Sequence, residues 1–246
     1  LTNEKATFLG RKKNNGTGTH FMWENRDIRY NVLRAVGYYK GKAVAEDILV
    51  LNGLEQAPHF GILYQDTKPL LKGEDGYNYL YRINCGGDDF TDSFGQLWMQ
   101  DNTNYSRSWA ASFNELNPYL ASQRTTNDPI RGSRDWKLFQ YFRFGRHQLE
   151  YNFPVADGMY RIEFYFTEPW HGTGGSASAD CEGLRIFDVA VNDSVVLDDL
   201  DIWAESGHDG ACKKVVYAIV KGGLLKIHFP EVKAGQALIS GIAIAS

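Results

Sequence analysis

The stretch YRIEFYF at residues 160–166 decides the fold class of this 246-residue chain. Apolar and polar side chains alternate along it, so that Tyr160, Ile162, Phe164 and Phe166 share one face of an extended segment. Successive side chains of a β-strand point to opposite faces of its sheet. The pattern therefore predicts a strand with one face turned toward a core.

Similar patterns recur on the C-terminal side of this stretch. In residues 184–191, Phe187, Val189 and Val191 share one face. Further strands are predicted at residues 195–197, 215–220, 224–229 and 238–245, with turn residues between them. Helical periodicity is nearly absent, apart from one or two turns expected within residues 113–122. Short strands between turn signals indicate an all-β sandwich or barrel.

The first 51 residues form a separate group of predicted strands. These strands are expected at residues 5–10, 19–23, 31–39 and 43–51, with a hairpin turn at 39–42. Residues 52–78 contain two prolines and four glycines with little alternation, which predicts a connecting segment. Four strands make only part of a sandwich, so the first unit is either incomplete or packed against the second.

Composition narrows the classes of partner. The net charge is −4 and no basic stripe is present, so we expect neither nucleic acid nor anionic membrane as a partner. No apolar run reaches the roughly 18 residues that a membrane-spanning helix needs. No signal-peptide pattern follows Leu1.

Metal and disulfide chemistry receives little support from spacing. The spacing of Cys85, Cys181 and Cys212 fits no zinc motif. Two alternatives stay open: all three are buried or half-buried thiols, or Cys181 and Cys212 form a disulfide bridge. The histidines His147, His171 and His208 also lack metal-ligand spacing. We expect no cofactor, although a structural Ca²⁺ site is compatible with such a fold.

Catalysis is not expected of this chain. Glu168, Asp180, Glu182 and Asp188 could supply the two carboxylates of a glycosidase, but carboxylates alone carry little information. The alternating β and α pattern of a catalytic barrel is missing, and so are a phosphate-binding loop and a serine nucleophile motif.

Five groups of residues after position 79 carry a family resemblance. They are RINCGG at 82–87 followed by Asp92, Gly95, Trp98 and Asp101; YNFPV at 151–155 with GMY at 158–160 and FYFTE at 164–168; GLRIFDV at 183–189; DLDIW at 199–203; and ISGIAI at 239–244. On these ordered motifs, the segment resembles the malectin family, carbohydrate-binding module family 57.

The first segment carries a shorter resemblance. FLGRK at 8–12, NVLRAVGY at 31–38 and GKAVAED at 41–47 are similar to the C-terminal immunoglobulin-like domain of glycoside hydrolase family 2 enzymes. EPWHG at 168–172 and RFGR at 143–146 resemble the bacterial, enzyme-linked branch of malectin-like domains more than animal malectin.

Together the resemblances imply an architecture and a setting. A partial immunoglobulin-like β-sandwich would occupy residues 1–56, a linker 57–78, and a malectin-like jelly-roll β-sandwich 79–246. The chain would be the C-terminal accessory part of a bacterial β-galactosidase-like enzyme involved in polysaccharide utilisation. Its partners would be an oligo- or polysaccharide and the parent catalytic domain, in a secreted, periplasmic or cell-surface location.

The resemblance also implies sugar contacts, because Trp98 takes the position of a stacking aromatic and Asp201 that of a ligand-binding aspartate. Further candidate residues follow from their loop-like surroundings and their chemistry. An indole can stack on the C–H face of a sugar, and an arginine can pair with an acidic sugar. The candidate carbohydrate-binding residues are Trp98, Trp109, Trp136, Trp170, Arg146, Asp199 and Asp201. We expect Trp98 and Asp201 to lie at one groove.

Each candidate also has a structural alternative. A tryptophan can be a core residue or a loop anchor, an aspartate can accept local backbone hydrogen bonds, and an arginine can bridge to a carboxylate. Trp203, in a strand-like run, is expected in the core.

The leading function is non-catalytic carbohydrate binding that orients a parent β-glycosidase on a glycan. Two alternatives stay open: a spacer or dimerisation module without sugar affinity, and a glycosidase active in its own right. Burial of all three of Trp98, Trp109 and Trp136, or their contact with the partner domain, would favour the spacer.

Overall fold

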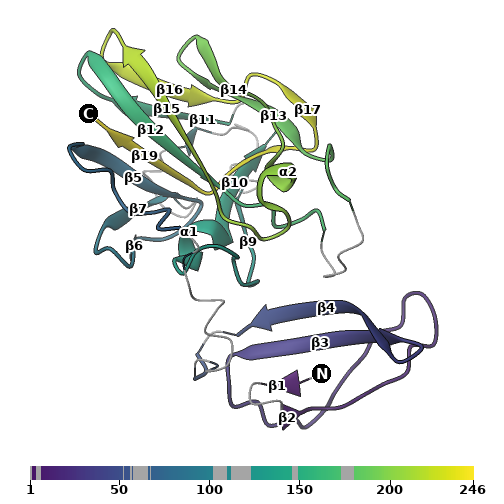
Figure 1. Cartoon of the computed structure of the whole chain (residues 1–246). Coiled ribbons are helices and arrows are strands. Elements are labelled where there is room, and N and C mark those ends of the chain that lie inside the picture. The colour runs from purple at the N-terminus through teal and green to yellow at the C-terminus, as the bar shows by residue number, and fades with distance from the viewer. Residues whose placement is uncertain are drawn as a thin grey trace.

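The protein is an all-β sandwich with a smaller sheet at its N-terminal end (Figure 1). The computed structural model describes residues 2–3, 7–51, 53–55, 57, 66, 68–101, 110–111, 123–145, 149–172 and 180–246. The strands are β1 (Thr2–Asn3), β2 (Thr7–Phe8), β3 (Val32–Tyr39), β4 (Lys42–Val50), β5 (Tyr79–Cys85), β6 (Phe90–Thr91), β7 (Leu97–Asp101), β8 (Ala110–Ala111), β9 (Gln123–Thr125), β10 (Tyr141–Gly145), β11 (Glu150–Pro154), β12 (Gly158–Phe166), β13 (Ile186–Val191), β14 (Ser194–Leu200), β15 (Cys212–Val220), β16 (Leu224–His228), β17 (Val232–Ala234), β18 (Ala237–Ile239) and β19 (Gly241–Ala245). The helices of the described residues are α1 (Trp136–Gln140) and α2 (Ile202–Ser206).

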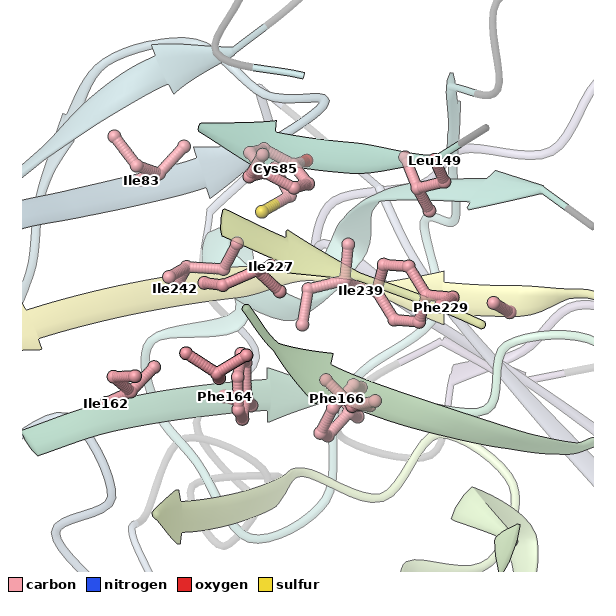
Figure 2. Packing of buried hydrophobic residues seen from close by; sticks show 14 of the residues in the cluster. Ile83, Cys85, Leu149, Ile162, Phe164, Phe166, Ile227, Phe229, Ile239 and Ile242 are labelled. Atoms are coloured by element: carbon pink, nitrogen blue, oxygen red, sulfur yellow. The ribbon is translucent and has the colours of Figure 1, made fainter. Parts of the chain in front are cut away.

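Two six-stranded sheets form the sandwich. One has the order β15-β12-β19-β5-β7-β6, and the other has the order β14-β13-β16-β11-β8, with β17 added beside β13. Apolar side chains from both sheets interdigitate in one core, as Ile162 and Phe164 of β12 and Ile227 of β16 do in Figure 2. A core between two sheets of mainly antiparallel strands is the arrangement that short alternating strands predict, and the sequence-based fold class is confirmed; within these sheets β5 and β7 pair in parallel.

Strand β12 occupies an interior position in its sheet, between β15 and β19, and is buried on both faces. The predicted face, from Tyr160 to Phe166, points into the main core. The opposite face carries Arg161, Glu163 and Tyr165, which are also buried. Because polar side chains in the interior need partners, the second face must be covered by further structure.

That cover comes from the segment before β5. The Glu163 carboxylate accepts hydrogen bonds from the hydroxyls of Tyr79 (2.8 Å) and Tyr165 (2.5 Å) and pairs with Lys213 Nζ (2.9 Å) and Arg161 Nε (3.0 Å). Lys213 also donates to the carbonyl of Leu70 at 2.8 Å. The described residues from 68 onward, expected as part of a linker, are therefore bound to the outer face of the sandwich.

The C-terminal run, expected as one strand over residues 238–245, is divided between two sheets. β18 pairs with β10, whereas β19 pairs with β12 and β5. Ser240 lies at the change of direction, where its backbone N–H donates to the carbonyl of Tyr165 at 2.9 Å. Apolar residues lie on both sides of Ser240 and Gly241, so the apolar run was read as one strand and the break was missed.

The N-terminal sheet has the order β2-β1-β3-β4. The hairpin between β3 and β4 turns at Lys40 and Gly41, both with positive φ (48° and 80°), as the predicted hairpin requires. Residues 19–23, expected as a strand, are not part of a sheet. Tyr30, Val32, Val50 and Ala57 join a second apolar cluster with residues of the sandwich.

The three cysteines are free and buried, so the alternative of a Cys181–Cys212 bridge is not realised. Neither described helix has the length and apolar character required to span a bilayer.

Candidate functional site

Trp98 lies in the protein interior and not at a groove. Its side chain is fully buried, and its indole N–H donates to Oδ2 of Asp92 at 2.9 Å. The ring meets Tyr165 edge to face, with ring centroids 5.2 Å apart, and stacks with Phe90. No face of the indole is open to a sugar, so its position matches the core alternative.

Trp136 begins helix α1 and is also buried. It belongs to the second apolar cluster, which combines residues of the sandwich with Tyr30, Val32 and Val50 of the N-terminal part. Trp136 therefore helps to join the two parts of the chain, and its burial leaves little surface for a ligand.

Asp201 is the N-cap of helix α2. One carboxylate oxygen accepts the N–H of Ala204 (3.0 Å) and the other accepts the N–H of Gly183 (2.6 Å). An N-cap aspartate satisfies a donor that the first turn of a helix leaves free. Ile202 and Trp203, expected in a strand-like run with Trp203 in the core, instead begin helix α2 after this cap, and Trp203 is half-buried.

Asp199 lies at the surface just before this helix. Its φ is 50°, its N–H donates to Asp188 Oδ1 at 2.9 Å, and its carboxylate pairs with Lys233. Trp98 and Asp201 share no contact that would place them at one groove, so the expected pair is not supported.

Trp170 is the exposed aromatic among the described candidates, with 69% of its surface accessible. It lines a hollow of about 350 Å³ together with Pro169, Phe142 and the polar run Arg124, Thr125 and Thr126. An indole beside a guanidinium and two hydroxyls offers both an apolar platform and hydrogen-bonding groups. The lining residues from β9 and β10 were not predicted, since RTT at 124–126 has no distinctive spacing.

A buried ion pair holds the loop of Trp170. Oε1 of Glu168 accepts the backbone N–H groups of Trp170 (2.9 Å) and His171 (3.0 Å), and Oε2 meets Arg185 Nε at 2.5 Å. Burial alone would raise the pKa of Glu168, but Arg185 and the two N–H groups hold this pKa below its usual value. Glu168 is thus an anchored anion, not a free catalytic acid.

Gly172 continues this loop toward helix α2. An added Cβ there would lie 3.1 Å from Trp203 Nε1 and 3.0 Å from His208 Cβ. His208 Nε2 meets Asp209 Oδ2 at 2.9 Å, and burial raises the pKa of Asp209. The loops after β12 and around α2 are therefore packed together at one end of the sandwich.

The remaining candidates, Trp109 and Arg146, lie outside the described residues, as does the helical segment expected at 113–122.

Comparisons with known proteins agree with this fold. The family model described as "Malectin domain" matches residues 79–245. Malectin of Danio rerio is 26% identical over 150 residues, which cover 61% of this chain and 47% of that protein. This chain thus spans about half the length of the curated relatives it matches.

Two solved structures show the same fold. Beta-glucuronidase 2 of Bacteroides uniformis, bound covalently to cyclophellitol-6-carboxylate aziridine, aligns with a TM-score of 0.54 and 24% identity over 87% of this chain and 22% of that chain. The ANX2 ectodomain from Arabidopsis thaliana aligns with a TM-score of 0.51 and 15% identity over 69% of this chain and 50% of that chain. Because the family model covers more than half of the residues, the chain belongs to the malectin family, with its malectin domain at residues 79–245.

Proposed function

We propose that the malectin domain binds an oligo- or polysaccharide without cleaving it. The observation that supports this is the exposed indole of Trp170 beside a hollow lined by Arg124, Thr125 and Thr126. Sugars present an apolar C–H face for aromatic stacking and hydroxyls for polar groups. The anchored loop beneath Trp170 supports the same role, because a fixed platform loses less entropy on binding.

The proposed contact surface consists of Trp170, Arg124, Thr125 and Thr126. Asp201, Asp199, Trp109 and Arg146 remain proposed contributors. Trp98 and Trp136 are left out because their side chains are buried.

We further propose that the chain is the C-terminal accessory part of a bacterial family 2 β-glycosidase, located outside the cytoplasm, and that it orients the parent enzyme on its glycan. The likeness to the Bacteroides uniformis enzyme covers 87% of this chain, more than the roughly two thirds that the malectin match spans, so it extends before Tyr79. This supports an immunoglobulin-like unit at 1–56, a connecting segment at 57–78 and the malectin domain at 79–246.

A glycan array with the whole chain, followed by calorimetry on the strongest glycan, tests sugar binding. Trp170→Ala should weaken affinity by about 5- to 150-fold, the equivalent of about 1–3 kcal/mol. Tyr39→Ala is the matched control, because Tyr39 is an exposed aromatic (64%) on the hairpin of the N-terminal sheet. Equal affinity of both variants would reject the Trp170 surface, and an array without any bound glycan would reject the function.

The second candidate is a structural spacer without sugar affinity. The buried Trp136 and the apolar cluster shared by both parts of the chain favour it. A glycan-negative array together with stable association of this chain with the catalytic domain of such an enzyme would support the spacer.

A further inference from the structure

Three potential metal ligands from two distant segments meet near the Trp170 loop. One ligand atom from each of Asp128, His208 and Asp209 lies within 4.8 Å of the others. His208 Nε2 and Asp209 Oδ2 are paired at 2.9 Å, slightly closer than two ligands of one ion would lie. Atoms bound at about 2.1 Å and at angles near 90–109° are about 3.0–3.4 Å apart.

The carboxylate of Asp209 supplies an independent observation that points to a cation. Its side chain is only 10% exposed, and Oδ2 faces His208. The other oxygen, Oδ1, is buried and accepts no hydrogen bond from the described part of the chain. Buried carboxylate oxygens normally have partners, because desolvation without one is costly. A bound cation would supply that partner.

The backbone of Asp209 is fixed in a conformation that few aspartates adopt. Its φ is 51°, its N–H donates to the carbonyl of Glu168 at 2.9 Å, and its carbonyl accepts the N–H of Arg131 at 2.8 Å. Arg131 Nη2 also donates to the carbonyl of His208 at 2.7 Å. Residues that persist in sparsely populated conformations cluster at binding sites.

Asp128 is held from its own side. Its N–H donates to Thr126 Oγ1 at 3.1 Å, the Thr126 hydroxyl donates back to Oδ2 at 3.0 Å, and Gln140 donates to the Asp128 carbonyl at 2.9 Å. The three ligand residues are therefore positioned by separate hydrogen bonds before any ion arrives, which lowers the cost of binding.

The charge and type of the ligands select the ion. Two carboxylates and a neutral imidazole carry two negative charges, which match a divalent cation. Ca²⁺ takes six to eight oxygen ligands, whereas Zn²⁺ accepts nitrogen with oxygen and binds three protein ligands plus water. Arg131 adds a positive charge nearby, but its guanidinium is engaged by the carbonyls of Ser206 and His208.

From this arrangement we infer that Asp128, His208 and Asp209 form a binding site for a divalent transition-metal ion, zinc foremost. The ion would join the segment after β9 to the loop after α2. Thr126 lines the hollow beside Trp170 and also holds Asp128. A metal there would stiffen one wall of the proposed sugar surface, yet the inference does not depend on sugar binding.

Calorimetric titration of the chelator-treated chain with zinc chloride tests the inference. We expect one zinc ion per chain, a melting temperature that rises with free zinc, and weaker binding of calcium chloride. Cobalt chloride should produce visible absorption bands of a low-coordinate site. If the wild-type chain takes up no zinc stoichiometrically, the three residues are only a hydrogen-bonded cluster and the inference is wrong.

Variants then locate the ion. Asp128→Asn, His208→Gln and Asp209→Asn should each weaken zinc binding by more than about tenfold, since even the loss of a partner outside the ligand set costs about 10–100-fold. Asp199→Asn is the control, because it removes a carboxylate from the separate acidic group Asp188, Asp198 and Asp199. Zinc binding that survives all three ligand variants would place the ion elsewhere and overturn the assignment. If the variants of the more buried residues do not fold, Asp128→Asn alone still tests the assignment.

Discussion

The indole Nε1 of Trp98 donates to Oδ2 of Asp92 over 2.9 Å, and the ring is enclosed by Phe90 and Tyr165. The family resemblance gave Trp98 a sugar-stacking role, but in this chain the residue joins the edge strand β6 and its neighbour β7 to the outer face of β12. Its partner Asp92 also accepts the backbone N–H groups of Phe94 and Gln96, both at 2.9 Å. Trp98 therefore organises the turn between the two strands.

Trp98→Ala should destabilise the protein strongly. Removal of a fully buried tryptophan leaves a large cavity and typically costs about 3–5 kcal/mol. It also leaves one oxygen of Asp92 without its donor. Urea unfolding at neutral pH measures the loss, and Trp170→Ala, at an exposed position, should stay within about 0.5 kcal/mol of the wild type. Similar stability of the two variants would contradict the core assignment.

Glu163 should make the fold sensitive to acid. Burial raises the pKa of Glu163, but the hydrogen bonds from Tyr165, Lys213 and Tyr79 lower this pKa by more than burial raises it. The net shift of the pKa is therefore downward. A folded-state pKa below the unfolded value of about 4.3 gives stabilisation that is full above that pH. This stabilisation is lost as the pH falls through the folded-state pKa.

Glu163→Gln tests this dependence. The variant leaves Lys213 and Arg161 without their shared anion, and breaking a buried ion pair costs about 3–5 kcal/mol. In unfolding free energies measured from pH 7 to pH 3, the loss relative to wild type should be largest at pH 7 and should shrink below pH 4. Glu231→Gln, at an exposed glutamate, serves as the control. A difference that is constant over the whole range would exclude Glu163 as the source.

Gly86 and Gly95, both in the motif of residues 82–101, separate the effect of a positive φ from that of close packing. Both have positive φ, 80° and 78°, but a Cβ on Gly86 would lie 2.9 Å from the backbone carbonyl oxygen of Phe142, whereas one on Gly95 would meet nothing within 4 Å. Gly95→Ala should cost about 1–2 kcal/mol from the backbone conformation alone. Gly86→Ala should cost about 1–3 kcal/mol more, because the carbonyl is part of β10 and cannot move freely. Equal melting temperatures of the Gly86→Ala and Gly95→Ala variants would mean that the backbone around Phe142 moves away from the added Cβ at little cost in free energy.

The sequence predicted those features that depend on near neighbours. The alternation of residues 160–166 gave β12, and Lys40 with Gly41 gave the first hairpin. The burial of Arg161 and Glu163 could not be predicted in this way, because their partners Tyr79 and Lys213 are distant in the chain.

The candidate site was harder to predict for the same reason. The sequence singled out Trp170, but residues 124–126, which line the same hollow, are distant in the chain, and Asp128 lies far before His208. Helix α2 did leave a signal: Asp201 is a favoured N-cap residue, and the following Ile-Trp-Ala-Glu contains good helix formers. Ile202 and Trp203 favoured a strand, and that interpretation was wrong, because β14 ends at Leu200 and α2 begins at Ile202.

Two variants of Asp201 distinguish a helix-capping role of its carboxylate from a sugar-binding role. Asp201→Ala removes acceptors for the N–H groups of Ala204 and Gly183 and should cost about 0.5–2 kcal/mol. Asn is an equally good N-cap, so Asp201→Asn should recover most of that stability in urea unfolding. If Asn restores stability and the glycan identified on the array still binds the variant fully, the carboxylate serves helix α2 alone. If stability is restored but calorimetry finds affinity reduced by about tenfold or more, the negative charge itself contacts the sugar, because asparagine offers one carbonyl oxygen and an amide where a hydroxyl would meet two acceptors. Loss of stability in the Asn variant equal to that in the Ala variant would contradict the capping geometry.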